Sequence, residues 1–87
     1  MRTTRIQPEA LEHLSEWAAF EPKTLKRIFR ILEECCRTPF EGIGKPEPLK
    51  ANKAGLWSRR ITDEHRLLYE VTDTDIIVHA LRGHYDD

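Results

Sequence analysis

A cluster of prolines and glycines between residues 38 and 55 divides this sequence into two parts that differ in secondary structure. The cluster holds three of the five prolines and three of the four glycines of the chain. Both residue types interrupt helices and strands. We therefore expect a long loop between a helical half and a β-rich half. Its apolar residues Phe40, Ile43 and Leu49 favour an ordered loop over a disordered linker.

Before this loop, apolar residues recur at the spacing of two amphipathic helices. Pro8 suits the first turn of one helix, and Pro22 both ends that helix and can begin the next. Two helices joined by a tight turn predict a helical hairpin, with residues 3–6 as a short strand before it. The apolar positions recur every three or four residues in each helix: Leu11, Leu14, Trp17 and Ala18, then Leu25, Ile28, Phe29, Leu32 and Cys35 or Cys36.

After the loop, three segments show the polar and apolar alternation of β-strands. They cover residues 56–61, 66–71 and 76–82, and turn residues separate them. The order β-α-α-β-β-β predicts an α+β fold, in which the N-terminal short strand and the helical hairpin pack on a small antiparallel β-sheet. In the last strand, alternation places three residues on each side: Ile77, His79 and Leu81 against Ile76, Val78 and Ala80.

The length of the chain predicts a single domain spanning residues 1–87. A chain this short buries only about 60% of its unfolded surface, so a partner subunit would help to stabilise it. No apolar run approaches the ~18 residues of a membrane span, and the N-terminus lacks the apolar region of a secretion signal. We therefore expect a cytoplasmic protein without membrane contact. The histidines and cysteines match no metal-binding spacing, so no metal or cofactor is expected.

Charge is distributed unevenly along the chain. Residues 23–66 carry eleven Lys and Arg against six Asp and Glu, a net charge of +5, whereas the flanking segments carry −2 and −4. A basic surface suits an anionic partner such as a nucleic acid, because neutralised phosphates release counterions. A charged, solvated surface without a partner is an equally good interpretation of charge alone.

One loop residue is a candidate general base. Glu47 lies between Pro46 and Pro48, which fix their own φ and keep Glu47 out of the helical region. A carboxylate presented by a stiff loop costs little entropy to position for proton transfer. A solvated loop glutamate is the alternative interpretation of this residue taken alone.

Three arginines form a second candidate group: Arg59, Arg60 and Arg66. If the segments on either side of the 62–65 turn pair as a hairpin, Arg60 and Arg66 lie close across its end. A guanidinium can bind two phosphate oxygens at once and can stabilise negative charge that develops during phosphoryl transfer. Ordinary surface arginines beside the acidic residues of the turn are the alternative.

His84 and Tyr85 follow the last predicted strand. Histidine ordinarily holds both protonation forms near neutral pH, so His84 suits the role of a general acid. Tyr85 could stack on a base or donate a hydrogen bond to a phosphate. Because only Asp86 and Asp87 follow, a frayed chain end is the alternative.

The remaining histidines and the cysteines have structural interpretations. His13 falls on the polar side of the first predicted helix, where we expect solvated surface. His65 lies in the turn between the first two of the three predicted strands. It is interpreted either as a surface residue or as an aid to phosphate binding. We expect His79 to be partly buried and hydrogen-bonded in the last strand. Cys35 and Cys36 are expected to pack as small apolar side chains in a reducing compartment.

Four segments of the sequence closely resemble the YoeB/Txe toxins of the RelE/ParE superfamily. They are RTPFEGIGKPEPLK at 37–50, GLWSRRITDEHRLLY at 55–69, VTD at 71–73 and HY at 84–85. The first 36 residues match in pattern rather than in motif. The combination is specific to this family, whereas no single segment is.

The resemblance implies a fold and a set of partners. Such toxins have a small antiparallel sheet flanked by helices and often form homodimers. They belong to type II toxin–antitoxin pairs, so a cognate antitoxin of the YefM/Phd-like kind is expected, with DNA contacted only indirectly through that antitoxin. The family enters the ribosomal A site and cleaves mRNA there, so the ribosome and mRNA are expected partners.

The resemblance also implies roles for the candidate residues. Glu47 matches the catalytic base of the family, His84 its catalytic acid, and Arg66 the arginine that stabilises the phosphate. Three further residues match positions that contact or support the substrate: Lys50, Arg60 and Tyr85.

The expected activity is that of a metal-independent endoribonuclease. The 2′-OH of a ribose would attack the adjacent phosphate and leave a 2′,3′-cyclic phosphate and a 5′-OH. The alternative is a non-catalytic protein, either a ParE-like toxin that inhibits a DNA-handling enzyme or a translation inhibitor that blocks the A site. The chain departs from expectation in its net charge of −1 and in the two aspartates beyond Tyr85.

Overall fold

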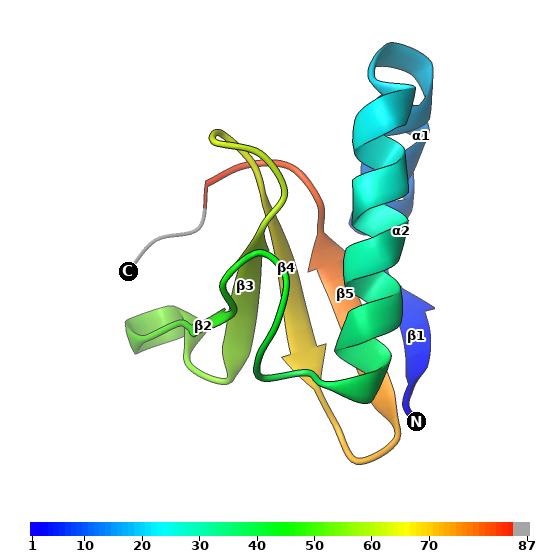
Figure 1. Cartoon of the computed structure of the whole chain (residues 1–87). Coiled ribbons are helices and arrows are strands. Elements are labelled where there is room, and N and C mark those ends of the chain that lie inside the picture. Colours follow the sequence, from blue (N-terminus) through cyan, green and yellow to red (C-terminus); the bar gives the residue numbers. More distant parts are fainter. Residues whose placement is uncertain (85–87) are drawn as a thin grey trace.

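Two helices cover one face of a five-stranded sheet in this computed structural model, which describes residues 1–84 (Figure 1). The elements follow in chain order: β1 (Thr3–Ile6), α1 (Pro8–Phe20), α2 (Pro22–Arg37), β2 (Glu47–Pro48), the short 3-10 helix η1 (Ala51–Lys53), β3 (Leu56–Arg60), β4 (Arg66–Val71) and β5 (Asp75–Ala80). The predicted α+β fold, with a short strand and a helical hairpin packed on a sheet, is confirmed.

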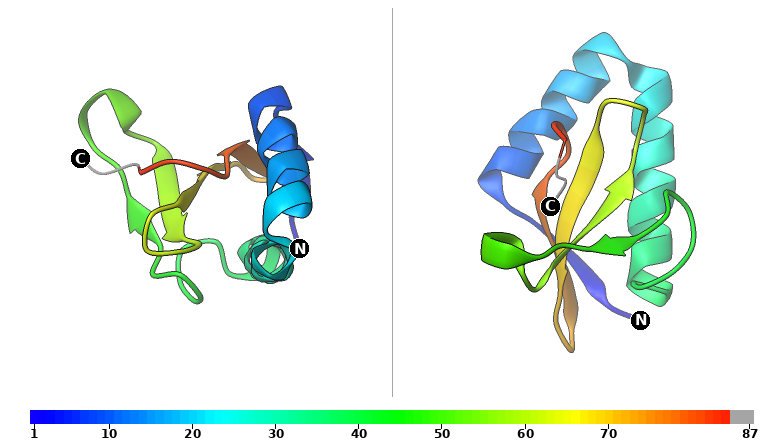
Figure 2. Two further views of the ribbon diagram at one scale, coloured as in Figure 1. Left: turned by 90° about the horizontal axis from the view of Figure 1, so that it is seen from above. Right: turned by 90° about the vertical axis from the view of Figure 1, so that its left-hand side faces the viewer.

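The sheet is mixed, with strand order β1-β5-β4-β3-β2. The three predicted strands β3, β4 and β5 pair antiparallel, as expected. The strand β2, which lies in the predicted loop, pairs antiparallel with β3, whereas β1 pairs parallel with β5. The helical hairpin accounts for this difference. It carries the chain from β1 over one face of the sheet, and the antiparallel strands β2 to β5 that follow end with β5 beside β1 in the same direction. In the right-hand view of Figure 2, the uncovered face of the sheet is toward the viewer and the helices lie behind it. We call this uncovered face the open face.

Prolines set the boundaries of both helices. Pro8 and Pro22 each occupy the first turn of a helix, where the missing N–H would have no partner within the helix. The helix α1 ends at Phe20, and the N–H of the next residue, Glu21, donates to the carbonyl of Trp17 at 2.8 Å. The helix α2 ends before Pro39, which disfavours a helical conformation at Thr38.

The main core lies between the helices and the sheet. Its buried residues come from both helices and mainly from β4 and β5, while Trp57 of β3 packs against them partly buried; among the buried ones are Trp17, Ile28, Ile31, Leu32, Cys35, Leu67, Tyr69, Ile76 and Val78. A smaller cluster of Leu49, Leu68 and Ala80 lies on the open face, with Leu56 packed against it. Within the described residues, 1–84, no helix is both long enough and apolar enough to cross a membrane.

A bulge in β5 changes which side chains face the core. The register steps from Tyr69 opposite Val78 to Leu68 opposite Ala80, so one extra residue lies in β5. An extra residue reverses the alternation beyond it. The predicted grouping of the last strand is therefore wrong at its end, because Leu81 joins Val78 in the main core and Ala80 joins the open-face cluster.

Candidate active site on the open face of the sheet

The strand register brings the predicted base to the open face. Glu47 in β2 pairs with Ser58 in β3, and Ser58 pairs with Leu68 in β4. Residues directly opposite in antiparallel strands project to the same face. Because Leu68 belongs to the open-face cluster, Glu47 and Ser58 project to that face as well. Glu47 thus lies in a two-residue edge strand rather than in the stiff loop that we expected.

The two arginines of the predicted set occupy the next row of the same face. Arg60 pairs with Arg66, the residues that begin and end the turn of the β3–β4 hairpin, as predicted. Arg66 is buried, with 7% of its surface exposed, and its Nη1 donates to Ser58 Oγ at 3.1 Å. Arg60 is exposed. The Ser58 hydroxyl therefore holds the Arg66 guanidinium beside the row that contains Glu47.

The predicted acid approaches this face through a backbone hydrogen bond. The N–H of Arg66 donates to the carbonyl of Gly83 at 2.9 Å, which places Gly83, the residue before His84, against the start of β4. In Figure 1 the red segment after β5 runs away from the helices toward the open-face side. His84 is exposed, and Lys50 is exposed at the start of η1. Tyr85 lies outside the described residues.

Arg59 is not available to a substrate, contrary to its inclusion among the candidate phosphate ligands. It points to the opposite face from Arg60, and none of its side chain is exposed. Its five N–H groups donate five hydrogen bonds to surrounding acceptors: Tyr69 Oη, Glu34 Oε1, and the carbonyls of Thr38, Glu41 and Ile43. In a strand, Arg59 shares one face with the apolar residues Trp57 and Ile61. This alternation is the sequence signal that indicates its inward orientation.

The Arg59 cluster shapes the loop that leads to Glu47. The Arg59 Nη2 group donates to the carbonyls of Thr38 at 2.6 Å and Glu41 at 3.0 Å. Glu34 Oε1 accepts from Arg59 Nη1 at 2.7 Å and from the N–H of Ile43 at 2.6 Å. One buried guanidinium thus connects α2, the loop and the sheet, and it fixes the path of the chain toward β2.

Ionisation in this cluster follows from burial and from the arginine. Burial disfavours the charged carboxylate of Glu34, but hydrogen bonds from Arg59 and Ile43 outweigh it and lower the pKa of Glu34 below 4.5. Burial raises the pKa of the Cys35 thiol to about 11 and that of Tyr69 to about 12. All three groups are therefore in single protonation states near neutral pH, which suits a structural cluster.

Two histidines that we assigned to the surface make buried contacts. His13 is half-buried, and its Nδ1 accepts a hydrogen bond from the N–H of Leu81 at 3.0 Å, so the prediction of a solvated residue is wrong. His65 is half-buried as well, with its Nδ1 3.0 Å from the N–H of Gly83. His79 is partly buried and lies 3.1 Å from Glu70 Oε1, as predicted.

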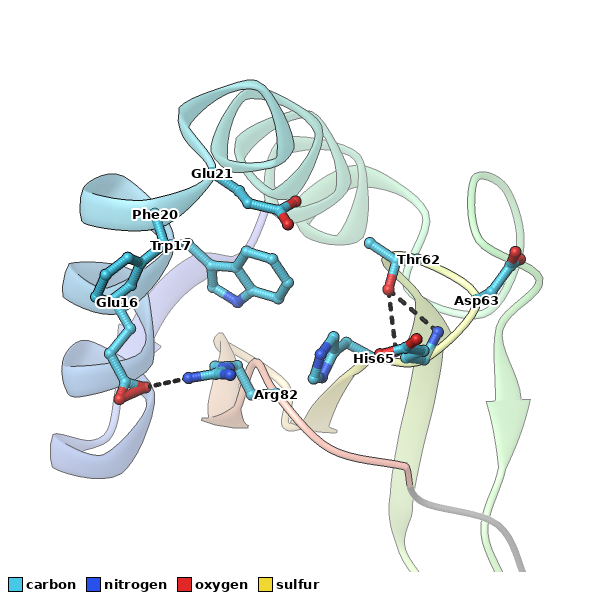
Figure 3. Close-up of a pocket in the computed structure, with 9 residues that line it drawn as sticks. Glu16, Trp17, Phe20, Glu21, Thr62, Asp63, His65 and Arg82 are labelled. Carbon is cyan, nitrogen blue, oxygen red and sulfur yellow. Dashed lines mark hydrogen bonds and ion pairs between the residues drawn. The ribbon is translucent and has the colours of Figure 1, made fainter.

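A cavity of about 450 Å³ lies near the β3–β4 turn, between that turn and α1 (Figure 3). Its wall includes the Trp17 indole, the His65 ring and the Arg82 side chain. Arg82 lies over the Trp17 ring at 5.7 Å and pairs with Glu16 at 2.9 Å. The residues lining this cavity include none of the five candidate site residues that the structure describes, so the cavity is not the candidate site.

Candidate metal ligands are not gathered in the described part of the chain. Among residues 1–84, no group of three or more His, Cys, Asp or Glu side chains is placed to hold a metal ion. Both cysteines are free and buried, as predicted.

Comparison with known proteins identifies close relatives of this chain. The model of a family described as YoeB-like toxin of bacterial type II toxin–antitoxin system matches residues 6–85. A Mycobacterium tuberculosis protein named Toxin RelK is 47% identical over 85 residues, which cover 98% of this chain and 100% of the relative.

Solved structures of similar proteins share the fold. A YoeB/ParE toxin from Agrobacterium tumefaciens superposes with a TM-score of 0.91 at 36% identity, covering 95% of this chain and 99% of that one. A YoeB dimer from Staphylococcus aureus gives 0.89 at 39% identity, covering 97% and 98%. The toxin of a heterotetrameric YoeB–YefM toxin–antitoxin complex from Staphylococcus aureus gives 0.87 at 38% identity, covering 98% and 99%.

Proposed function

We propose that this chain, which belongs to the YoeB-like toxins of bacterial type II toxin–antitoxin systems, is an endoribonuclease. Its proposed reaction is the cleavage of mRNA in the ribosomal A site. The observation that carries this proposal is the arrangement of Glu47 and Ser58 in one row of the open face and of Arg66 in the next row. The register pairs Glu47 with Ser58, and Ser58 holds the Arg66 guanidinium at 3.1 Å. A carboxylate and a guanidinium in neighbouring rows of one face suit one ribose–phosphate junction.

In the proposed reaction Glu47 takes the proton from a ribose 2′-OH. The freed oxygen attacks the adjacent phosphorus, and the bond from phosphorus to the 5′-oxygen breaks. Arg66 stabilises the negative charge on the phosphoryl oxygens, and His84 donates a proton to the departing 5′-oxygen. The products are a 2′,3′-cyclic phosphate and a 5′-OH, and these three side chains supply the base, the acid and the charge without a metal ion.

Three further residues are assigned to binding. Arg60 is exposed in the row of Arg66, and Lys50 is exposed two residues beyond β2, and this exposure supports their assignment to contact with phosphates. We assign Tyr85, which lies outside the described residues, to stacking on a base or to contact with a phosphate. The 2′-OH nucleophile restricts the reaction to RNA.

The partners of this chain follow from the same proposal. A YefM-like antitoxin would bind the toxin and restrain it, since a solved relative forms a YoeB–YefM complex. A homodimer is the proposed assembly, because another relative is a YoeB dimer. Ribosome, mRNA and toxin would meet in the cytoplasm, with promoter DNA contacted through the antitoxin.

The test is cleavage of a programmed ribosome by the Glu47→Gln variant, with primer extension to map new 5′ ends in the presence of excess chelator. We expect wild-type protein to produce ends at the A-site codon and Glu47→Gln to be slower by a factor of about 10²–10⁴. Glu41→Gln is the matched control, because Glu41 is an exposed glutamate of the loop that leads to β2.

Two results would contradict the proposal. Cleavage by Glu47→Gln at the wild-type rate would remove Glu47 from the reaction. Stalled but intact message with wild-type protein would instead support the non-catalytic alternative, in which the toxin only blocks the A site.

A further inference from the structure

We propose that His65 is a positioning residue for the catalytic acid, acting with His13 to hold the segment that presents His84. This inference rests on the proposed function, in which His84 donates a proton to the leaving group. It starts from the hydrogen bonds of residues 81–83, the segment between β5 and His84.

Side chains from two distant parts of the chain, α1 and the β3–β4 turn, bind this segment. At its first residue, the N–H of Leu81 donates to His13 Nδ1 at 3.0 Å, and Trp17 Nε1 donates to the Leu81 carbonyl at 2.9 Å. At its last residue, the N–H of Gly83 donates to His65 Nδ1 at 3.0 Å, and its carbonyl accepts from the N–H of Arg66 at 2.9 Å. The backbone polar groups of Leu81 and Gly83 are therefore all paired.

The ring of His65 is itself held in place. It lies edge-on to the Trp17 indole, with ring centroids 5.2 Å apart and an interplanar angle of 88° (Figure 3). The N–H of His65 donates to Thr62 Oγ1 at 3.1 Å, and its carbonyl accepts from the N–H of Ile61 at 2.9 Å. A ring fixed by its backbone and by an aromatic neighbour can in turn fix Gly83.

Both contacts specify one form of the imidazole. A backbone N–H needs an acceptor, so Nδ1 of His13 and of His65 must carry a lone pair, with the ring proton on Nε2. In the other neutral tautomer, or in the doubly protonated ring, an N–H would face an N–H. The structure thus assigns the Nε2–H tautomer to both histidines.

The position of His84 depends on this arrangement because His84 lies outside the sheet. The strand β5 ends at Ala80, and Gly83 has a φ of +108°, a conformation that side-chain-bearing residues rarely adopt. The described bonds at Leu81 and Gly83 therefore set the direction in which the chain reaches His84. A shift of about 1 Å in a reacting group can lower a catalytic rate by about 10²-fold.

Two substitutions at His65 separate its acceptor from its ring. His65→Phe keeps an aromatic edge against Trp17 and removes the acceptor, whereas His65→Asn removes the ring and keeps an oxygen near the position of Nδ1. We expect His65→Phe to lower kcat by a factor of about 10–100 with little change in KM, because it displaces the acid and leaves the binding residues in place. His65→Asn should recover most of that loss.

Amide hydrogen exchange at Gly83 tests the contact independently of activity. We expect the Gly83 N–H to be protected in wild-type protein and in His65→Asn, and to exchange faster in His65→Phe. Unchanged Gly83 exchange and unchanged kcat in a folded His65→Phe protein would overturn the inference. Equal losses in the Phe and Asn variants would also overturn it, because the acceptor would then not be the cause.

The ring nitrogens of wild-type protein give a test that needs no variant. Nitrogen-15 spectra distinguish the two neutral tautomers, and the inference requires a protonated Nε2 and an unprotonated Nδ1 at His65. A proton on Nδ1 would overturn it even if His65→Phe fails to fold. If wild-type protein does not cleave mRNA, the proposed function fails, while the tautomer and exchange results still decide whether His65 holds Gly83.

Discussion

Arg59 Nη1 lies 2.7 Å from Glu34 Oε1, and this ion pair joins a fully buried arginine to a carboxylate whose side chain is 24% exposed. The pair connects the middle of β3 to α2 on the helix-covered side of the sheet. Arg60, the residue after Arg59, projects to the open face, where the proposed chemistry takes place. The two adjacent arginines therefore differ in environment: Arg59 organises the loop toward Glu47, whereas Arg60 is exposed and is the one proposed to contact a substrate.

We predict that Arg59→Met destabilises the protein by about 3–5 kcal/mol, because it leaves the Glu34 carboxylate and the loop carbonyls without their donor. Urea unfolding followed by circular dichroism measures this loss. Arg60→Met is the matched control, since it changes an exposed arginine next in sequence and should have a small effect. Equal destabilisation by the two substitutions would contradict the structural role of Arg59.

Acidification should weaken the protein through Glu34. The pKa of Glu34 is lowered in the folded protein by Arg59 and Ile43, so its stabilising contribution is complete above the unfolded value of 4.5 and is lost as the pH falls through the lowered folded value. We expect Glu34→Gln to be less stable than wild type at pH 7 and the difference to shrink at acid pH. Urea midpoints measured from pH 7 to pH 3 check this, and a constant difference would contradict it.

The buried thiol of Cys35 should resist alkylation in the folded protein. Burial raises its pKa to about 11, so little reactive thiolate exists near pH 8, and the sulfur is not exposed to reagent. We expect iodoacetamide to label Cys35 in urea and to leave it unlabelled under native conditions, as read by fragment mass spectrometry. Rapid native labelling would show that α2 opens or that Cys35 is not in the core.

Replacement of Arg66 should affect catalysis more than folding. We expect Arg66→Lys to keep a positive charge but to lose the planar fork, and to lower kcat by about 10²–10³-fold. Ser58→Ala should have a smaller effect in the same direction, since it removes only the hydroxyl that holds Arg66 Nη1. Single-turnover cleavage of programmed ribosomes measures both, and an unchanged rate in Arg66→Lys would argue against transition-state stabilisation by Arg66.

The sequence predicted those features that depend on neighbouring residues. Pro8 and Pro22 mark helix starts because proline fits the first turn of a helix. The position of Arg60 opposite Arg66 follows from the length of the turn between them, because the turn sets the register of a hairpin. The predicted roles of Glu47, Arg66 and His84 came from resemblance to a family and remain predictions.

Other features depend on contacts between segments far apart in the chain. The partner of His13 is the N–H of Leu81, 68 positions away, and helical periodicity carries no sign of it. Arg59 could be assigned to the inner face by alternation, but its acceptors are carbonyls of a loop with no regular pattern. The bulge between Val78 and Ala80 is likewise a property of the β4–β5 pairing rather than of either strand alone.

The most direct test of the proposed reaction is the chemistry of the attacking oxygen. Two messages would be placed in the ribosomal A site, identical except that one carries a single 2′-deoxyribose at the nucleotide 5′ to the cleaved bond. We predict that this protein cuts the all-ribose message to a 2′,3′-cyclic phosphate and a 5′-OH and leaves the deoxy message intact. Cleavage of both messages at similar rates would contradict the account, because the nucleophile would then not be the 2′-OH.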